Sequence, residues 1–432
     1  MARIVLATIG SLGDLHPFIA IGRSLAARGE RVLLAVPEDH MAKVKAAGLE
    51  AAPILPSFAS ICARLGLSDA EVAAKVLADR DFVIDEILMP SLRASTAALD
   101  AVADGADALA GSTFAFSAAI VAEKRRLPLA TIILQPMTLF SAWQPPVARQ
   151  FELMRHRPQT RLGYGWNSAV LSLARTILRR RHARRIDAVR AEHGLGPGEG
   201  APLLDHGPAT AAILCCWSSA LGALPPDVPS MAALTGFPFF DSETGADDGQ
   251  PAQLPELDSF LDECRQANDP PLIFTLGSFA VASAGRFYEN AAAISWDLGK
   301  RALLLTGRPQ PPHRDGNCLF LQYAPHSAVF PEAAVVIHHG GIGTTGQALR
   351  AGRPQIVVPH FGDQFDNAAR LVSAGIALTV KRERFGDGRT VRVLAQVLSD
   401  RAMAQAAQHA ADVVAGEDGA ASAAERIVRL CS

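Results

Sequence analysis

The chain has 432 residues, more than one hydrophobic core usually organises, so we expect two domains. Hydrophobic residues make up 49% of the chain and charged residues 19%, a balance typical of a well-packed globular protein and not of a disordered one. The formal net charge of −2 provides no overall attraction to nucleic acid or to an anionic membrane.

The N-terminus predicts a buried strand, because six apolar or small residues follow Arg3 before Gly10. A secretory signal peptide would need a longer apolar region and a cleavage site. No segment approaches the run of about 18 apolar residues that a membrane-spanning helix requires. The cysteines show no Cys-x-x-Cys spacing, which indicates reduced core thiols in a cytoplasmic protein and not a disulfide framework or a zinc site. They are Cys62, Cys215, Cys216, Cys264, Cys318 and Cys431.

Apolar strands alternate with helices along both halves of the chain. In the first half the pattern predicts a strand, a helix and four further strands: Arg3–Ile9, the helix from about Pro17 to Ala27, Arg31–Val36, Ala108–Ala110, Leu129–Leu134 and Ala211–Cys216. The second half repeats the pattern with strands at Pro271–Leu276, Ala302–Leu305, Cys318–Leu321, Val335–Ile337, Gln355–Val358 and Ile376–Val380. Such alternation predicts parallel sheets wound by right-handed crossovers.

The two halves are separated by a segment rich in Pro, Gly and Asp, which is typical of a linker. We therefore predict an N-terminal domain over 1–220, a linker over 221–265 and a C-terminal domain over 266–412, followed by a helix in 413–432 that packs back on the first domain. The predicted fold class is α/β, with two doubly wound domains facing each other. Ligands should bind in the cleft, at the carboxyl ends of the strands.

A glycine-rich loop, His339-Gly340-Gly341-Ile342-Gly343-Thr344, lies between two of the predicted strands of the second half and opens a short helix. In a strand–loop–helix unit the loop brings backbone N–H groups and a helix N-terminus to one point, which suits an anion such as phosphate. The loop has no Lys, so it is not a P-loop, and it lacks the G-x-G-x-x-G order of dinucleotide folds. Taken alone, such glycines could also serve only a turn.

A second polar pair, Asp363-Gln364, begins 24 residues after His339, at the mouth of the next strand. A carboxylate beside an amide offers hydrogen-bond acceptors and donors to a polyol. The two motifs together therefore indicate a ligand that carries both phosphate and hydroxyl groups.

These intervals resemble the donor-binding signature of the family 1 nucleotide-sugar glycosyltransferases, which have the GT-B fold. The signature H-x-G-x-x-[ST], then G-x-P, then P-x-x-x-D-Q is matched by His339, Gly341, Thr344, Gly352, Pro354, Pro359, Asp363 and Gln364. Tyr323-Ala324-Pro325-His326 stands where the family has W-x-P-Q under the nucleobase. The N-terminal "GSLGDLHPF" and "TGFPFFD" at Thr235–Asp241 are similar to the bacterial branch that holds the rhamnolipid rhamnosyltransferase and the sterol and antibiotic glycosyltransferases.

The resemblance assigns roles to the matched positions. It implies diphosphate binding by Ser278, His339, Gly341, Gly343 and Thr344, nucleoside binding by Tyr323, Ala324 and Gln347, and sugar binding by Asp363 and Gln364. Three positions depart from the family pattern: Tyr323 replaces Trp, His326 replaces Gln, and Gln347 stands where uridine-using relatives carry Glu. The neutral Gln347 leaves UDP and dTDP donors equally open.

The N-terminal motif Gly13-Asp14-Leu15-His16-Pro17 places Asp14 where plant relatives carry the His that acts as general base. Asp14 is therefore the candidate base, with Gly10, Ser11 and Gly13 on the acceptor side. Asp14 could instead only cap the helix that begins near Pro17, and the two roles are compatible. His16 is two residues out of register for a base, so we interpret it as a packing residue.

Two further segments are ambiguous from the sequence. Seven arginines over Arg175–Arg190 alternate with apolar residues at helical spacing, which predicts either a solvated amphipathic helix or a basic face on anionic lipid. Met137, Phe140 and Trp143 follow a strand end in the acceptor half and would either wall an apolar pocket or pack against the linker.

The sequence thus predicts an inverting, metal-independent glycosyltransferase. It would move a hexose from a UDP- or dTDP-sugar to a hydroxyl of a lipophilic small molecule of the polyphenol, sterol or hydroxy-fatty-acid type. No cofactor besides the co-substrate and no nucleic-acid partner are expected, and the oligomeric state stays open. Two alternatives share the architecture, namely a sugar-nucleotide epimerase and a non-catalytic helper of a glycosyltransferase.

Overall fold

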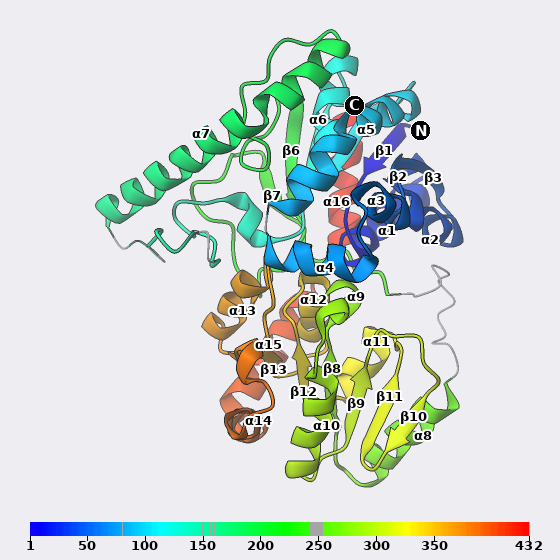
Figure 1. Ribbon diagram of the computed structural model, residues 1–432, viewed down its shortest axis with the longest axis vertical. Coiled ribbons are helices and arrows are strands. Elements are labelled where there is room, and N and C mark those ends of the chain that lie inside the picture. Colours follow the sequence, from blue (N-terminus) through cyan, green and yellow to red (C-terminus); the bar gives the residue numbers. More distant parts are fainter. Residues whose placement is uncertain (80, 149–150, 156–157, 159, 242–253, 432) are drawn as a thin grey trace.

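The computed structural model describes residues 1–79, 81–148, 151–155, 158, 160–241 and 254–431, without the side chains of residues 73, 77, 278, 279 and 282. Two α/β domains lie one above the other, and the chain crosses between them more than once (Figure 1). The part of the predicted linker at 242–253 lies outside the described residues.

The first domain contains a seven-stranded sheet in the order β3-β2-β1-β4-β5-β6-β7, in which every neighbouring pair is parallel. Its strand β1, in the interior of the sheet, consists of apolar residues with no exposed surface from Ile4 to Ala7, as expected where helices cover both faces of a parallel sheet. The strands are β1 (Arg3–Ala7), β2 (Arg31–Pro37), β3 (Glu50–Leu55), β4 (Ala108–Ser112), β5 (Leu129–Ile133), β6 (Thr210–Cys215) and β7 (Ala232–Leu234).

The second domain contains another seven-stranded sheet, in the order β10-β11-β9-β8-β12-β13-β14. All pairs are parallel except β10 with β11, an antiparallel pair at one edge. The strands are β8 (Leu272–Thr275), β9 (Ala302–Leu305), β10 (His313–Asp315), β11 (Cys318–Leu321), β12 (Val335–His338), β13 (Gln355–Val357) and β14 (Ala377–Thr379). The prediction of two doubly wound parallel sheets is confirmed.

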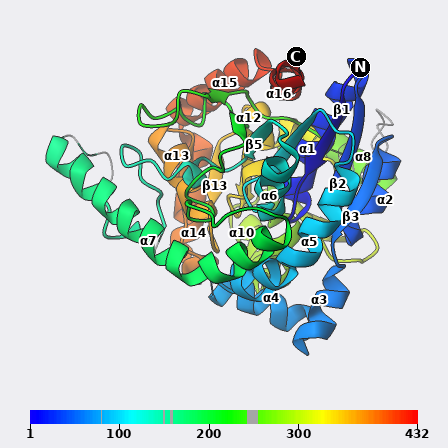
Figure 2. The ribbon, with the colours of Figure 1, turned by 90° about the horizontal axis from the view of Figure 1, so that it is seen from above.

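Helices cover both faces of each sheet, and one long helix, α7, extends along the outside of the first domain (Figures 1 and 2). In the first domain the helices are α1 (Leu12–Ala27), α2 (Met41–Ala46), α3 (Phe58–Leu65), α4 (Asp69–Ala78), α5 (Met89–Val102), α6 (Phe116–Arg125) and α7 (Arg161–Glu192). The others are α8 (Pro255–Gln266), α9 (Gly277–Ala280), α10 (Phe287–Asp297), α11 (His326–Val329), α12 (Ile342–Arg350), α13 (Gln364–Ser373), α14 (Gly388–Ser399), α15 (Arg401–Ala415) and α16 (Gly419–Val428).

Two boundaries differ from the predictions. α1 begins at Leu12 and not near Pro17, because Ser11 caps the helix with a capping box and Pro17 is accommodated inside it. The segment predicted as linker, 221–265, contains β7 and most of α8. This segment contains a short edge strand and a helix that packs on the second domain through Leu257, Phe260 and Leu261, although its polar, proline-rich composition is typical of a linker.

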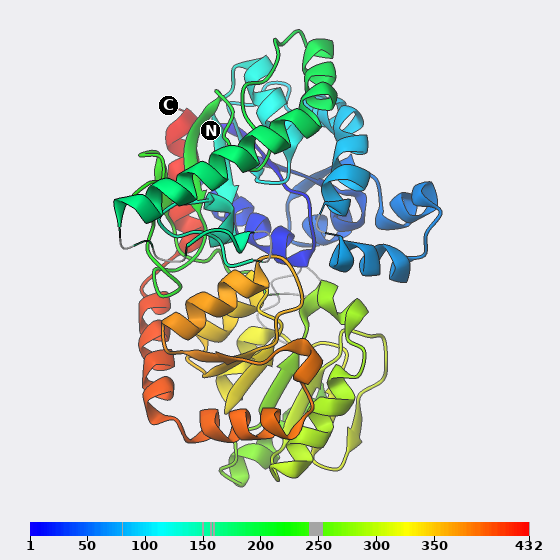
Figure 3. The same ribbon diagram turned by 60° about the vertical axis from the view of Figure 1, so that its left-hand side comes forward.

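The C-terminal helices connect the domains physically. α15 packs on α12 of the second domain, and α16 then lies against α1 and β6 of the first (Figure 3). Ala423, Ala424 and Ile427 of α16 have no exposed surface and share one hydrophobic cluster with Ile4 of β1 and Leu349 of α12. One core therefore continues from the first domain into the second through this helix pair.

We expect Ile427→Ala to lower the free energy of unfolding by about 2–5 kcal/mol, because it removes a fully buried side chain from the cluster that joins the domains. Ile427→Val should cost only about 0.5–1.5 kcal/mol. Urea unfolding followed by circular dichroism measures both. Equal unfolding midpoints for Ile427→Ala and the wild type would contradict the role of α16 in stability.

Candidate functional site

A cleft of about 1620 Å³ lies between the two domains, lined by loops from both. In the first sheet the strand order reverses at β1, because β2 lies on one side of it and β4 on the other. In the second sheet β8 holds the same position, between β9 and β12. Loops that follow strands at such switch points form binding crevices in α/β proteins. The loops after β1 and β12 line the cleft from opposite sides.

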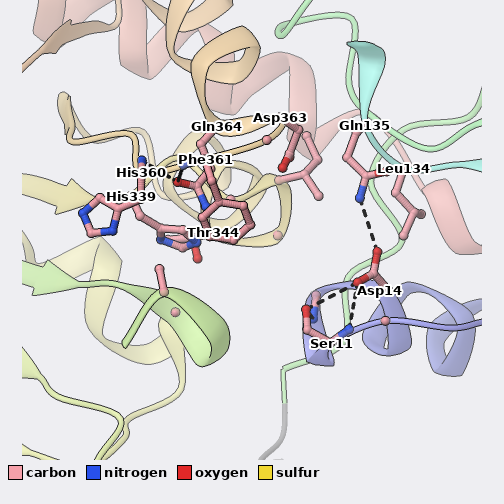
Figure 4. A pocket seen from close by; sticks show the side chains of 18 of the residues that line it. Ser11, Asp14, Leu134, Gln135, His339, Thr344, His360, Phe361, Asp363 and Gln364 are labelled. Carbon is pink, nitrogen blue, oxygen red and sulfur yellow. Dashed lines mark hydrogen bonds between the residues drawn. The ribbon is translucent and has the colours of Figure 1, made fainter. Parts of the chain in front are cut away.

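Asp14 extends into the cleft from the first turn of α1. Its Oδ2 accepts hydrogen bonds from the Ser11 backbone N–H at 2.9 Å and from the Ser11 hydroxyl at 3.4 Å, while Oδ1 accepts one from the Gln135 side-chain amide at 3.3 Å (Figure 4). Burial raises the pKa of Asp14, opposed mainly by the Ser11 backbone hydrogen bond. A carboxylate with one loosely held oxygen and a raised pKa suits proton abstraction.

Gly10 makes this arrangement sterically possible. Its φ of +143° is a conformation that side-chain-bearing residues rarely adopt, and a Cβ there would lie 2.2 Å from Asp14 Oδ2. The Gly10 carbonyl oxygen lies 2.9 Å from His40 Nε2. Gly10, Ser11 and Gly13 all line the cleft, so the structure places the predicted acceptor-side residues around Asp14.

The wall of the cleft beside Asp14 is mostly apolar. A π-helical segment, Val83–Leu88, contributes to it, together with the loops that follow β4 and β5. Met137 and Phe140 line the cleft on one side and pack on Phe151 and Leu171 on the other. The apolar lining on this side consists of Val76, Val83, Ile84, Leu88, Phe114, Leu134, Met137 and Phe140. Of the two uses considered for Met137 and Phe140, lining an apolar pocket is therefore observed, and the residues on which they pack lie outside the predicted linker.

On the opposite wall, His339 is held between two glycines. A Cβ on Gly277 would lie 2.7 Å from the imidazole, and one on Gly341 would lie 2.4 Å from its Nε2. Burial holds the pKa of His339 well below its usual value, so the ring is neutral near pH 7. Its Nδ1 is buried without a hydrogen-bond partner in the described part of the chain.

The N-terminus of α12 opens into the cleft next to His339. Its N-cap is Gly341, which provides no side-chain cap, and Gly343 has open space around it. The first backbone bond of the helix runs from Thr345 N–H to the Gly341 carbonyl, so the preceding amides point to the site. An uncapped helix N-terminus is an anion-binding arrangement, with the buried Thr344 beside it.

His338 supports this loop from behind. Its Nδ1 accepts from the Gly340 backbone N–H at 3.1 Å, which leaves the proton on Nε2 for the Gln355 side-chain oxygen at 2.9 Å. Gly340 has a φ of +92°, and Asn367 donates to its carbonyl oxygen at 2.9 Å. Burial lowers the pKa of His338 to about 4, so this scaffold is neutral.

The predicted nucleoside residues lie in different environments. Tyr323 lines the cleft, and its hydroxyl donates to Asp241 at 2.9 Å. Gln347 also lines the cleft, and its side-chain oxygen is buried without a hydrogen-bond partner among the described residues. Ala324 is fully buried in the second domain's core, so its side chain does not reach the cleft.

Asp363 and Gln364 line the cleft near Asp14. Asp363 Oδ2 accepts from the Asn367 amide at 2.8 Å, and burial raises the pKa of Asp363 to about 7, with a further contribution from the negative charge of Asp14. The Gln364 side-chain oxygen accepts from the backbone N–H groups of His360 and Phe361 at 2.8 and 3.2 Å. The Gln364 side chain therefore orders the loop after β13 and keeps its amide NH₂ for a ligand.

His360 was not predicted as a site residue from the sequence. This histidine lines the cleft between the His339 loop and Asp363, and both ring nitrogens are buried with no hydrogen-bond partner in the described part of the structure. Burial lowers its pKa to about 4. Its position at the end of a strand, four residues before Gln364, was a signal that could have identified it.

Other residues occupy supporting places. His16 packs edge-on against Phe240 at 5.4 Å between ring centroids, in keeping with its interpretation as a packing residue. Ser278 lies in α9, but its side chain is outside the described part of the structure. No group of three or more His, Cys, Asp or Glu side chains that could hold a metal ion occurs among the described residues. Within the same residues, no helix is long and apolar enough to cross a membrane.

Known proteins resemble the chain over its full length. Residues 308–430 match the family described as erythromycin biosynthesis protein CIII-like, C-terminal domain. An O-mycaminosyltylonolide 6-deoxyallosyltransferase of Streptomyces fradiae is 30% identical over 98% of this chain and 96% of that protein. A sterol 3-beta-glucosyltransferase of Aspergillus terreus is 26% identical over 99% of this chain, which spans only 30% of the fungal protein. A solved spinosyn rhamnosyltransferase, complexed with thymidine diphosphate, superposes with a TM-score of 0.65 at 20% identity over 99% of this chain and 100% of that one.

We expect Asp363→Asn to change how stability depends on pH. Since the folded-state pKa of Asp363, about 7, exceeds the ordinary 3.8, the folded protein holds a proton that the unfolded chain releases between these pH values. Stability is therefore lost as the pH rises through this window, with a slope of at most about 1.4 kcal/mol per pH unit from this group. Asparagine can still accept from Asn367 and should remove that slope.

Urea unfolding of the ligand-free protein at several pH values between 4 and 8 measures the effect, with Asp297→Asn, on the exposed end of α10, as the matched control. A wild-type slope that persists unchanged in Asp363→Asn would show that this carboxyl does not titrate in the window.

Proposed function

The chain belongs to the family 1 nucleotide-sugar glycosyltransferases of GT-B fold, and we propose that it transfers a hexose with inversion from a dTDP-sugar to a hydroxyl of a lipophilic small molecule. The observation that carries this proposal is the placement of one carboxylate, Asp14, across the cleft from an uncapped helix N-terminus and its neutral His339. The first group suits an acceptor hydroxyl, and the second suits a departing diphosphate.

In the proposed reaction the acceptor oxygen attacks the anomeric carbon and gives its proton to Asp14 Oδ1. The bond between that carbon and the diphosphate oxygen breaks on the opposite face, so the configuration inverts. The raised pKa of Asp14 makes it a stronger base than an exposed carboxylate, and the hydrogen bonds from Ser11 and Gln135 fix its orientation.

The departing diphosphate gathers negative charge, which the second domain would stabilise. The backbone N–H groups at the start of α12, the Thr344 hydroxyl and a donated N–H of His339 converge there without having to reorganise. We propose that these groups stabilise the leaving group without a metal ion. Transfer measured with and without a chelator tests this part of the proposal.

The donor is assigned from Gln347 and from the similar proteins. A deoxyribose has one free hydroxyl at its 3′ position, and the unpartnered side-chain oxygen of Gln347 can accept one hydrogen bond from it. A carboxylate would be the stronger acceptor for both hydroxyls of a ribose. The thymidine diphosphate in the spinosyn rhamnosyltransferase and the 6-deoxyallosyl transfer named for the Streptomyces fradiae relative support a dTDP-6-deoxyhexose.

The acceptor class is supported by the apolar wall beside Asp14. This wall would bury a rigid apolar scaffold, while one hydroxyl reaches the base. The named relatives act on a macrolide and on sterols, both large and apolar with reactive hydroxyls.

The proposal is tested by mass spectrometry of reactions that combine dTDP- and UDP-hexoses with macrolide, sterol, polyphenol and hydroxy-fatty-acid acceptors. We expect a glycoside of a lipophilic acceptor with dTDP-sugars. Conversion of the donor to an epimer without acceptor would instead identify an epimerase, and no reaction with any pair would favour a helper protein.

We predict that Asp14→Asn lowers turnover by about 10²–10⁴-fold while donor affinity and melting temperature stay near wild type, because asparagine keeps the hydrogen bond from Ser11 but cannot take a proton. Asp39→Asn serves as the control, since Asp39 only accepts from the Phe58 backbone N–H outside the cleft. Turnover within about threefold of wild type would remove Asp14 from the chemical step.

We predict that Gln347→Glu shifts the ratio of affinities toward UDP over dTDP by about fivefold, since a charge-assisted bond to a ribose hydroxyl exceeds a neutral one by about 1 kcal/mol. Gln322→Glu adds the same charge elsewhere on this wall of the cleft and should leave the ratio unchanged. Calorimetry with the two free nucleotides decides between them. Equal shifts in both variants would place Gln347 away from the ribose.

A further inference from the structure

The outward face of α7 carries large apolar side chains that no other element of the described chain covers. Of the ten exposed large apolar side chains in the described part of the chain, five fall on this helix and on the segment that precedes it. The exposed fractions are 73% for Leu153, 85% for Leu162, 51% for Trp166, 61% for Leu173 and 55% for Ile177. Figure 2 shows that the N-terminal half of α7 extends beyond the body of the protein.

These side chains form one stripe. At 100° per residue, positions 162, 166, 173 and 177 fall within about 60° of one another on the helix. The buried residues of α7, which include Asn167, Leu171 and Val189, lie on the opposite face. The stripe is about 22 Å long at 1.5 Å per residue. It is therefore a continuous surface and not a set of scattered residues.

On the same face of α7, the apolar stripe is followed by positively charged side chains. Arg180 and Arg184 follow the stripe at the same angular position and are exposed, with no ion pair among the described residues. Other arginines of the helix are neutralised within the chain, such as Arg181 by Asp81 and Asp85. Asp187 borders the face, but its carboxylate accepts from the Gly198 backbone N–H.

The stripe is continuous with the acceptor wall of the cleft. The Trp166 indole N–H donates to the Leu153 carbonyl at 2.7 Å, which fixes the segment 151–155 against α7. Leu171, on the inner face of α7, packs in the cluster of Met137 and Phe140, which also line the cleft. One layer of structure thus separates the exposed stripe from the apolar wall.

We propose that this face, Leu153 with the outer side of α7 from Leu162 to Arg184, docks on an anionic lipid surface. Apolar side chains including a Trp beside unpaired arginines are the composition of a helix that lies in a membrane interface. A second copy of the chain fits less well, because parallel pairing of two such faces would place Arg180 and Arg184 against the same residues of the partner. Docking would hold the acceptor wall at a surface where lipophilic acceptors dissolve.

The test is co-sedimentation of the full chain with vesicles, without substrates. We expect binding to an equal mixture of phosphatidylglycerol and phosphatidylcholine, and much weaker binding to phosphatidylcholine alone. Arg180→Glu with Arg184→Glu should lower the partition coefficient on the anionic vesicles at least about 25-fold, at about fivefold for each arginine lost. Arg392→Glu with Arg426→Glu, on exposed positions of α14 and α16, is the control of equal charge and should change it less than about twofold.

Leu173→Ser with Ile177→Ser should weaken binding while preserving the melting temperature, because both side chains are exposed. Transfer to a water-soluble acceptor in the absence of vesicles should be unchanged in all these variants, so loss of docking is distinguishable from failure of the proposed reaction. The proposal is overturned if wild type does not sediment with anionic vesicles, or if the α7 and control arginine variants bind equally. It is also overturned if Leu173→Ser with Ile177→Ser changes only the oligomeric mass, which would assign the face to pairing between copies.

Discussion

The proposed reaction depends on holding face to face two loops that belong to different sheets. In that reaction the base, Asp14, follows β1 and the anion site beside His339 follows β12, so each domain contributes one of the two groups. The distance between them is set by the contacts that join the domains. Phe237 packs so closely on α12 that a Cβ on Gly346 would lie 3.0 Å from its ring. The approach of α16 to Gly236 is closer still, since a Cβ on Gly419 would lie 2.4 Å from the Gly236 carbonyl oxygen. A movement that closed the cleft would therefore pivot at these contacts.

Burial favours the neutral forms of both the acidic and the basic side chains in the cleft. The desolvation that raises the pKa values of Asp14 and Asp363 lowers those of His16, His338, His339 and His360. In the ligand-free protein the second domain's wall therefore presents neutral imidazoles and backbone dipoles, besides the cations of Lys381 and Arg382. In the proposed reaction the neutral groups would lose little hydration when a diphosphate binds, and their attraction would grow with the negative charge on the leaving oxygen. This is the differential stabilisation that favours a transition state over a ground state.

Much of this arrangement follows from local sequence, and the rest depends on partners far along the chain. The parallel strands are predictable because each is a short apolar run, whereas β3 contains Pro53 and begins with Glu50, as an edge strand can. The start of α1 at Leu12 was predicted too late, at about Pro17, although Ser11 and Asp14 have the spacing of a capping box. The hydrogen bond from Gln135 to Asp14 joins residues 121 positions apart, and no local pattern encodes it. The same holds for the Ala324 side chain, whose burial only the packed second domain reveals.

The net charge of −2 conceals how charge is distributed on the surface. On α7 the arginines that face the body meet carboxylates of the first domain, and those that continue the apolar stripe do not. The net charge of the chain therefore argues against attraction to an anionic membrane, whereas the composition of this one helix face favours it. The outer face of α7 and the apolar wall beside Asp14 lie on opposite sides of one packed layer. The packing around Leu171 inside this layer therefore constrains the positions of both. A larger residue at position 171 would push Met137 and Phe140 toward the cleft, or would push α7 away from the body of the protein. The volume of the apolar side of the cleft is therefore coupled to the position of α7.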